Sequence, residues 1–426
     1  MKIAIISDIH LGDPKSTMAN KDGVGIRYPK FRSIIKENLG SNIDYLVLLG
    51  DIMDFAVSSY QEAYEAGRQF FIRLKRDNIA REIIYVPGNH DFDIWHAIEY
   101  EVNVINKIMN CKHVELFRFS VPGIIDDRHN SKTPGFTLRN VTAKAEPNMP
   151  KYAGLFLDSI TKTRPEDAET TKFNFGYPNL YLVTDNESVL ITHGQYLEQF
   201  WSMTGRLALR IFRNDLGVED PSYLNLKETV GINFPICQLS SSGSGQAGAL
   251  TERIQDIEHM VYSHYFKTIE TYLDHAIQIL KSQGGFVFRI LFWLINAKKK
   301  VIKTISKTEK TQYNEEFTQK EEVRKRFMDF YAASLKEIDD LKNDTIPFDI
   351  PYPTKVIFGH THVPIPWGFT GKPNDKPLYA PDGKPIFLYN CGGWLVEKNE
   401  GGQEEFKGAE IFLYDTGKGI SSVPVS

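Results

Sequence analysis

A pair of histidines follows a short apolar run in the last fifth of the chain. His360 and His362 come directly after the run Val356–Phe358 and a glycine, in the sequence VIFGHTHVP. On extended backbone, side chains two residues apart point to the same side. The spacing therefore predicts that two imidazole nitrogens are offered to whatever lies on that side.

Four further apolar runs end in polar residues of the same kinds. Each run has four to six β-branched or aliphatic residues, as expected of strands covered on both faces, and each breaks at Asp, His, Asn or Gly. The polar residues at the five run ends are Asp8, His10, Asp51, Asp54, Asn89, His90, Asp91, His193, His360 and His362. If the runs are neighbouring strands of one sheet, these side chains converge at one edge, beyond the carboxyl ends of the strands.

The types of these donors indicate the chemistry. Carboxylates, imidazoles and an amide oxygen form a mixed set that suits divalent Mn, Fe, Zn or Co better than Ca, which prefers oxygen alone. Seven donors are too many for one tetrahedral ion, and a shared carboxylate can hold two ions roughly 3.5–4 Å apart. The sequence therefore predicts a pair of divalent metal ions.

The order of these residues resembles that of the calcineurin-like metallophosphoesterases. The motifs D-x-H, G-D-x-x-D, G-N-H-D, H-G and G-H-x-H occur here in that order, at residues 8–10, 50–54, 88–91, 193–194 and 359–362. Any single motif is a weak signal, whereas the full set, with each motif behind an apolar run, is specific. The motifs extend from Asp8 to His362, and no recognisable motif lies in the segment between the last two.

The resemblance implies a role for each residue. One ion would be bound by Asp8, His10, Asp51 and His362, and the other by Asp51, Asn89, His193 and His360. Asp51 would bridge the two ions. His90 would be the catalytic side chain next to the leaving group and Asp54 would orient it, with Asp91 as a rival partner for His90.

The implied reaction is hydrolysis of a phosphate ester or anhydride. A water between two divalent ions is acidified towards neutrality and can attack phosphorus in line. The leaving oxygen then needs a proton, and histidine titrates near pH 7. The implied substrate is a phosphorylated small molecule or a lipid-linked phosphate.

Three related classes of protein can be compared with this pattern. Phosphoprotein phosphatases of the superfamily carry Arg-Gly after the second motif, whereas Phe55-Ala56 follows here, which disfavours that class. A nucleotide-lipid pyrophosphohydrolase similar to the UDP-diacylglucosamine hydrolases is the main alternative, although those enzymes tend to have arginine in place of His90. A non-catalytic scaffold of the same fold should show gaps in the ligand set, and the sequence shows none.

The elements that must position these residues follow from the same runs. Segments with helical spacing, around Phe31–Leu39 and Tyr60–Lys75, separate the first three runs, and alternating strands and helices predict a layered α/β fold. Residues 122–179 are less regular and are interpreted as long loops with one short helix. The resemblance implies a four-layer sandwich of mixed sheets flanked by helices.

A change in character from about residue 197 predicts a largely helical insertion. Apolar residues recur there at helical spacing, and the serine- and glycine-rich stretch Ser240–Gly248 is interpreted as a flexible joint. We therefore expect residues 1–196 to form the first part of the core, 197–350 to form the insertion or cap, and 351–426 to complete the core.

One part of the insertion suggests a lipid contact. Residues 284–307 combine a ten-residue apolar run with a following cluster of lysines, which is too short to span a bilayer but suits its interface. A helix packed in the insertion's own core is the simpler interpretation. The candidate lipid contacts are Phe286, Phe288, Phe292, Trp293, Lys298, Lys299 and Lys300.

The composition of the 426 residues limits the expected cellular location and the classes of binding partner. The net charge of −4 argues against a protein that wraps nucleic acid. Three widely separated cysteines form no disulfide framework, which favours a reducing compartment. No signal peptide and no transmembrane span are expected, so the predicted location is the cytoplasm, with peripheral membrane contact as the lipid-linked alternative.

Overall fold

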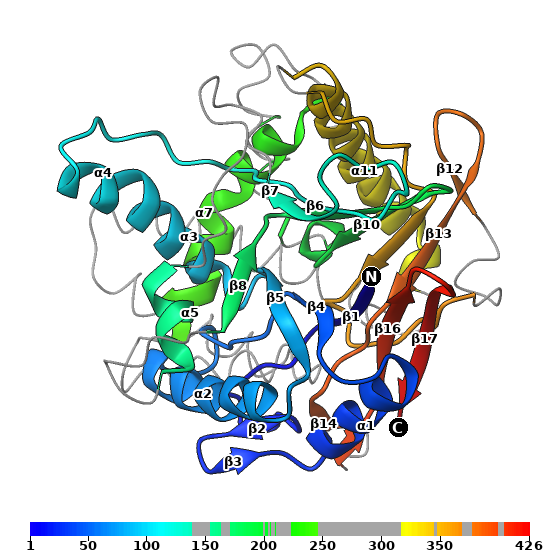
Figure 1. Ribbon diagram of the computed structural model, residues 1–426. Coiled ribbons are helices and arrows are strands. Elements are labelled where there is room, and N and C mark those ends of the chain that lie inside the picture. Colours follow the sequence, from blue (N-terminus) through cyan, green and yellow to red (C-terminus); the bar gives the residue numbers. More distant parts are fainter. Residues whose placement is uncertain are drawn as a thin grey trace, which may run out of the picture.

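The computed structural model shows two β-sheets packed together and flanked by helices (Figure 1). It describes residues 1–138, 154–162, 171–198, 201–202, 205, 209, 223–245, 317–344, 347–368, 377–398 and 404–426. Most of the predicted insertion, including every candidate lipid contact, lies outside the described residues.

The first sheet holds the strands that precede the first three motifs. Its order is β17-β16-β1-β4-β5-β8, with β1, β4, β5 and β8 parallel and β16 and β17 antiparallel at one side. The bounds are β1 Lys2–Ile6, β4 Ile43–Leu49, β5 Ala80–Val86, β8 Lys172–Phe175, β16 Ala409–Asp415 and β17 Gly419–Val425. The motifs at residues 8–10, 50–54 and 88–91 therefore follow three adjacent parallel strands.

The second sheet holds the strands that precede the last two motifs. Its order is β12-β13-β11-β10-β9-β6-β7, and β10, β11 and β13 run parallel. The bounds are β6 Gly123–Asp126, β7 Gly135–Leu138, β9 Asn179–Val183, β10 Ser188–Thr192, β11 Lys355–Phe358, β12 Leu378–Tyr379 and β13 Pro385–Asn390. The five apolar runs thus belong to two sheets, as the resemblance implied, and their ends meet although they are not neighbours in one sheet. Two short ribbons complete the strands, β2 (Ala19–Asn20) with β3 (Gly23–Val24) and β14 (Val396–Lys398) with β15 (Glu404–Phe406).

Helices connect the parallel strands and cover the outer faces. The α-helices are α1 Tyr28–Asn38, α2 Tyr60–Arg76, α3 Phe92–Tyr100, α4 Asn106–Met109, α5 Gly154–Ile160, α7 Leu226–Gly245 and α11 Glu321–Lys342. The short turns are the π-helix η1 Glu101–Ile105 and the 3-10 helices η2 Gln195–Leu197 and η5 Phe317–Gln319. α2 begins at a capping box made by Ser59 and Glu62. Because α7 continues through Gly245, the first part of the predicted flexible joint is helical instead.

Alternating side chains along the second sheet define the layers. Val189 and Ile191 of β10 pack into the core shared with the first sheet. Leu190, which points the other way, packs with Tyr331 and Leu335 of α11. α1 and α2 bury apolar side chains against the first sheet, on the side of the molecule away from α11 (Figure 1). The order helix, sheet, sheet, helix confirms the predicted α/β sandwich.

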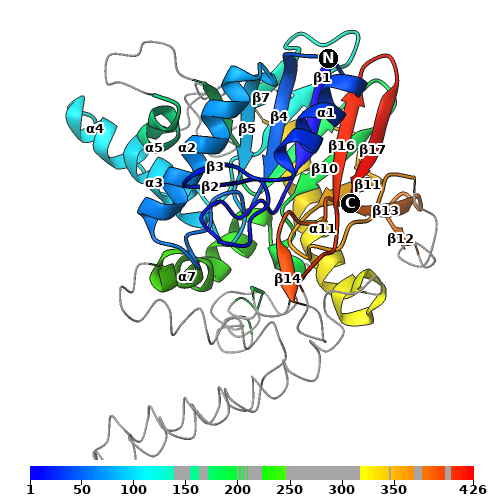
Figure 2. The same cartoon turned by 90° about the horizontal axis from the view of Figure 1, so that it is seen from below.

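The two ends of the chain meet in this sandwich. β1 pairs with β16 along four residue pairs, and β11, which follows the predicted insertion, pairs with β10, which precedes it. The helices α7 and α11 are described within residues 197–350, and they pack against each other on one side of the molecule (Figure 2). The boundaries of the insertion stay a prediction.

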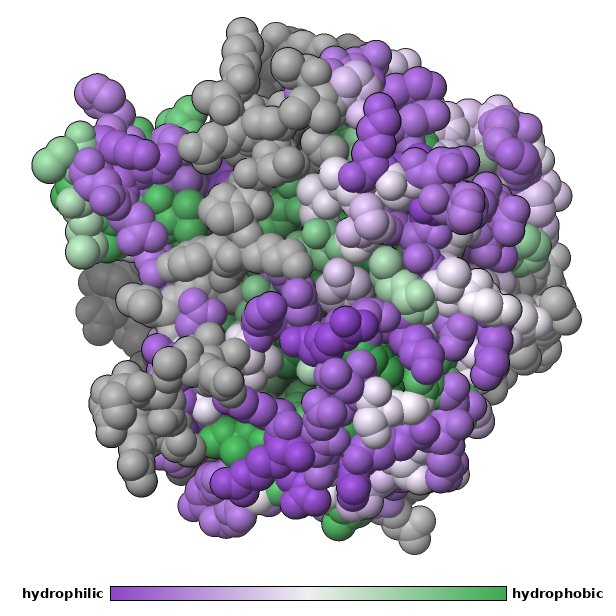
Figure 3. All heavy atoms as spheres, in the orientation of Figure 1, coloured by the Kyte–Doolittle hydropathy of each residue, from purple (hydrophilic) through white to green (hydrophobic). Residues whose placement is uncertain are grey.

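The surface is mainly hydrophilic on the face seen in Figure 3, and its hydrophobic side chains form small patches. Exposed apolar residues near α4 include Ile108, Met109 and Leu116. Among the described helices, none has the length and apolar character needed to cross a membrane.

Candidate metal centre

The predicted ligands lie in the segments that directly follow five strands, and the structure brings them together. β1, β4, β5, β10 and β11 end within five residues of the polar side chains that the sequence singled out. Almost all of these side chains are buried, with His362 partly exposed. They converge between the ends of the two facing sheets.

Unusual backbone conformations place several of these side chains. Positive φ angles between 52° and 70° occur at Asp8, His10, Asp51, His360 and His362. Left-handed backbone is uncommon for residues other than glycine, costs on the order of 1–3 kcal/mol, and clusters at functional sites. These angles also correct one expectation, because β11 ends at Phe358 and the two histidines of the last motif are on a turn and not on extended backbone.

The first donor cluster contains Asp8, His10 and His362. One ligand atom from each lies within 4.8 Å of the others. His362 Nε2 is 3.4 Å from Asp8 Oδ1 and 3.1 Å from His10 Nε2. These are the residues expected to bind one ion together with Asp51.

The second donor cluster contains Asp51, His193 and His360, again within 4.8 Å. His193 Nε2 lies 3.1 Å from Asp51 Oδ2 and 3.2 Å from the amide oxygen of Asn89. The turn of the last motif therefore sends His362 to one cluster and His360 to the other, although both were expected to point to one side.

Asp51 belongs to the second cluster and also lies near the first. Its Oδ2 atom is 3.1 Å from His193 Nε2 in the second cluster and 4.0 Å from His10 Nε2 in the first. Its other oxygen accepts a hydrogen bond of 2.8 Å from the backbone N–H of His90. Asp51 is thus near donors of both clusters, and its bridging role stays a prediction.

In three of the histidines, one ring nitrogen forms a hydrogen bond to an oxygen atom of a neighbouring residue. His10 Nδ1 bonds Asp54 at 2.7 Å, and His193 Nδ1 donates to the backbone oxygen of Leu49 at 3.0 Å. His360 Nε2 bonds Glu198 at 2.8 Å. Histidines that bind metal ions are commonly oriented in this way, with the far nitrogen donating to a carboxylate or a carbonyl oxygen.

Asp54, and not Asp91, is the partner of His90. His90 Nδ1 lies 3.0 Å from Asp54 Oδ1, so one carboxylate contacts both His90 and His10. Asp91 instead accepts hydrogen bonds from the backbone N–H groups of Ile52 and Gly88. It therefore fixes the loop that carries Asp51, and it bonds none of the histidines that the structure describes.

The charges of the centre favour a cation. Burial alone would raise the pKa of Asp51, but the nearby charges of His193 and His90 and the hydrogen bond from His193 hold it well below its usual value. Similar interactions lower the pKa of Asp8 and of Asp54. Burial acts to lower the pKa of His193, yet the charge of Asp51 raises it to about 9. The ionised carboxylates therefore attract positive charge, which a divalent cation would supply in place of protons.

Two further observations fit a metal ion. His360 Nδ1 is buried and has no hydrogen-bond partner among the described residues, which leaves a lone pair available to a ligand. Glycines bring the backbone close to the donors, because a Cβ atom on Gly359 would overlap Asp8 Oδ2 and one on Gly88 would overlap Asp51 Oδ1.

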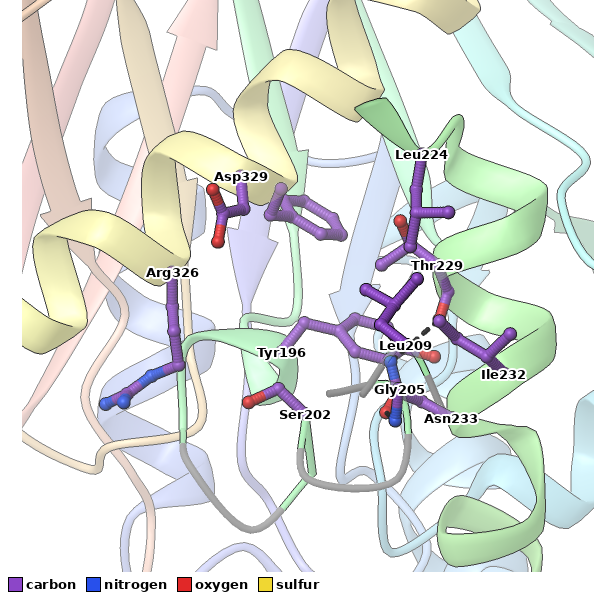
Figure 4. Close-up of a pocket in the computed structure, with 11 residues that line it drawn as sticks. Tyr196, Ser202, Gly205, Leu209, Leu224, Thr229, Ile232, Asn233, Arg326 and Asp329 are labelled. Carbon is purple, nitrogen blue, oxygen red and sulfur yellow. Dashed lines mark hydrogen bonds between the residues drawn. The ribbon is translucent and has the colours of Figure 1, made fainter. Parts of the chain in front are cut away.

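Glu198 is the residue of this centre that the sequence interpretation missed. It follows the 3-10 turn η2, five positions after His193, and falls within the segment assigned to the insertion. No motif marks it. A pocket borders the same turn, lined by Tyr196 and Ser202, by residues of α7 and by Arg326 and Asp329 of α11 (Figure 4).

Comparison with known proteins tests the family resemblance that the sequence motifs indicated. Residues 1–140 match the family model of calcineurin-like phosphoesterases. The matched residues include the first three motifs, and the match supports the superfamily predicted from all five. No curated protein matches the chain.

Proposed function

We propose that the protein is a metal-dependent hydrolase of phosphate esters or anhydrides, and that the two donor clusters are its active centre. The observation that carries this proposal is the position of Asp51, which belongs to the second cluster and lies 4.0 Å from His10 of the first. Each cluster offers ligand atoms within 4.8 Å of one another. Pairs of divalent ions that share a carboxylate are typical of phosphoryl-transfer enzymes.

Seven residues would hold two ions in this proposal. They are Asp8, His10, Asp51, Asn89, His193, His360 and His362. When bound, two divalent cations lower the pKa of a water molecule and stabilise negative charge on phosphoryl oxygens. The mixed donors suit Mn, Fe or Zn and do not choose between them.

The charge balance of this donor set favours a phosphate ligand. Two divalent ions bring four positive charges, of which Asp8 and Asp51 neutralise two. Asn89 supplies a neutral oxygen 3.2 Å from His193 Nε2, where an aspartate would remove a further positive charge. The remaining charge attracts the substrate.

His90 and Asp54 supply the proton transfer. Asp54 accepts from His90 Nδ1 at 3.0 Å, which holds the ring in one orientation and stabilises its protonated form. The backbone N–H of His90 donates to Asp51, so the backbone that carries the ring is fixed next to the centre. We infer that His90 protonates the leaving oxygen.

The substrate is proposed only by class. A phosphorylated small molecule is the first candidate and a lipid-linked phosphate the second. The apolar and lysine-rich residues that motivate the lipid-linked alternative lie outside the described part of the chain. A screen of phosphomonoesters, cyclic nucleotides and UDP-linked lipids separates these classes.

The direct test is hydrolysis of bis-p-nitrophenyl phosphate. We expect the chain to hydrolyse this ester with added Mn²⁺, to lose the activity with EDTA, and to regain it when Mn²⁺ is returned. Asp51→Asn should abolish the activity, whereas Asp22→Asn, which changes an exposed loop residue, should retain it. A wild-type protein that binds metal but hydrolyses none of the screened phosphates would favour the non-catalytic scaffold.

A further inference from the structure

We propose that Glu198 is a positioning residue that orients His360 as a ligand through Nδ1. This inference rests on the proposed metal-binding function and adds to it a residue outside every motif. Glu198 also lies outside the 140 residues that match the phosphoesterase family model.

The contact between the two side chains defines which ring nitrogen faces the centre. Glu198 Oε2 is 2.8 Å from His360 Nε2, and the two side chains are only 9% and 5% exposed. A carboxylate accepts hydrogen bonds, so Nε2 carries the proton and Nδ1 presents its lone pair. Without Glu198, the ring could also adopt the tautomer that protonates Nδ1.

The opposite nitrogen is available within the second cluster. Nδ1 of His360 is buried without a hydrogen-bond partner among the described residues, while His360 belongs to the cluster with Asp51 and His193. The backbone N–H of His360 donates to Asp8 at 2.9 Å. The residue is thus fixed at its backbone by Asp8 and at its ring by Glu198.

The turn that carries Glu198 is itself held in place. The backbone N–H of Glu198 donates to Gln195 at 3.1 Å, and that of Leu197 donates to Gly194 at 3.0 Å. From α11, Arg326 Nε donates to the backbone oxygen of Leu197. The carboxylate is therefore presented from a turn anchored both to the end of β10 and to α11.

Glu198 completes a pattern shared by the other two oriented histidines. Asp54 holds His10, and the backbone oxygen of Leu49 holds His193. Loss of such an outer partner typically lowers metal affinity about 10–100-fold. We therefore expect Glu198→Ala to weaken one of the two metal sites by this factor and to leave the other unchanged.

The test is a Mn²⁺ titration of the full-length protein, followed by electron paramagnetic resonance of the free ion. Wild type should bind two ions, and Glu198→Ala should weaken only one of them. Glu198→Gln, whose amide oxygen still accepts from Nε2, should fall between wild type and alanine. Glu187→Ala is the matched control, because Glu187 pairs with Lys355 at the opposite end of β10 and β11.

A double-mutant cycle separates positioning from a general structural role. If Glu198 acts through His360, the double variant Glu198→Ala with His360→Ala should bind metal no more weakly than His360→Ala alone. Additive losses, equal weakening of both sites, or a Glu198→Ala protein with wild-type affinities would overturn the inference. A wild type that binds no Mn²⁺ would instead refute the proposed function.

Discussion

At the scale of single residues, we expect His90 to act in catalysis without binding a metal ion. His90 is not one of the seven proposed ligands. Its Nδ1 atom lies 3.0 Å from Asp54 Oδ1, next to the centre. His90→Ala should therefore retain the metal ions and lower turnover by about 10²–10⁴-fold, which is the usual contribution of a proton-transferring side chain.

Metal analysis and steady-state kinetics of the same preparation measure both parts of this prediction. His113→Ala, at an exposed position, is the control and should behave as wild type. If His90→Ala turns over at the wild-type rate, His90 does not protonate the leaving group.

The types of the donors could be predicted from the sequence, but their pairing could not. Spacing after apolar runs indicated His360 and His362, whereas the left-handed turn that separates them into two clusters leaves no periodic signal. Asp91 is adjacent to His90 and Asp54 is 36 positions away, so distance along the chain does not identify Asp54 as the partner. Only the fold shows that Asp91 bonds the backbone of the loop after β4. Glu198 depends on a contact over 162 positions, which no local pattern encodes.

A buried glutamate connects α11 to the second sheet at the scale of elements. Glu337 accepts hydrogen bonds from Tyr181 at 2.9 Å, from Asn179, and from Ser120. Burial raises its pKa from 4.5 to about 7, against the opposing effect of these hydrogen bonds. The folded protein thus holds a proton on Glu337 at pH values at which the unfolded chain has released it.

This shift predicts a loss of stability with rising pH. Because the folded-state pKa is raised, the contribution of Glu337 is fully present below pH 4.5 and is lost as the pH rises towards 7. The loss is on the order of 3 kcal/mol. Glu337→Gln keeps acceptors for Tyr181 and Asn179 and cannot ionise, so its stability relative to wild type should increase between pH 5 and pH 8.

Urea unfolding midpoints at the two pH values measure this difference. Glu322→Gln, at an exposed position of the same helix, should show no such pH-dependent gain. A Glu337→Gln protein whose stability relative to wild type is the same at both pH values would contradict the assignment.

Long periodic elements were predicted better than short ones. The helices α1 and α2 and the five apolar strands follow the patterns in the sequence. The strands β6, β7 and β8 lie in residues interpreted as loops, because each has only four residues. β6 and β8 are also stabilised by pairing with the distant strands β9 and β5. Four residues are too few for a period of two to be recognised.

The proposed ions would connect distant parts of the chain at the scale of the whole molecule. Ligands from the first sheet, such as Asp8 and Asp51, meet ligands from the second sheet, such as His193 and His360. The apolar runs by themselves do not distinguish one sheet from two, because strand pairing such as that of β1 with β16 involves residues some 410 positions apart. A metal pair would link the two sheets where their strands end.

Metal binding should therefore stabilise the folded protein. An ion present at 100 times its dissociation constant contributes about 2.7 kcal/mol per site, provided that the unfolded chain does not bind it. We expect the thermal midpoint of EDTA-treated wild type to rise when Mn²⁺ is added. Asp51→Asn, which lacks the shared charge, should respond far less, and an equal rise in both proteins would show that Mn²⁺ binds elsewhere.

The most direct measurement is the number of metal ions per chain, determined by inductively coupled plasma mass spectrometry after equilibration with Mn²⁺ and removal of the free ion. We expect two ions on wild type and a marked loss from Asp51→Asn, because that carboxylate lies 3.1 Å from His193 in its own cluster and 4.0 Å from His10 in the other. A wild-type chain without metal, or an Asp51→Asn variant that retains both ions, would contradict this expectation.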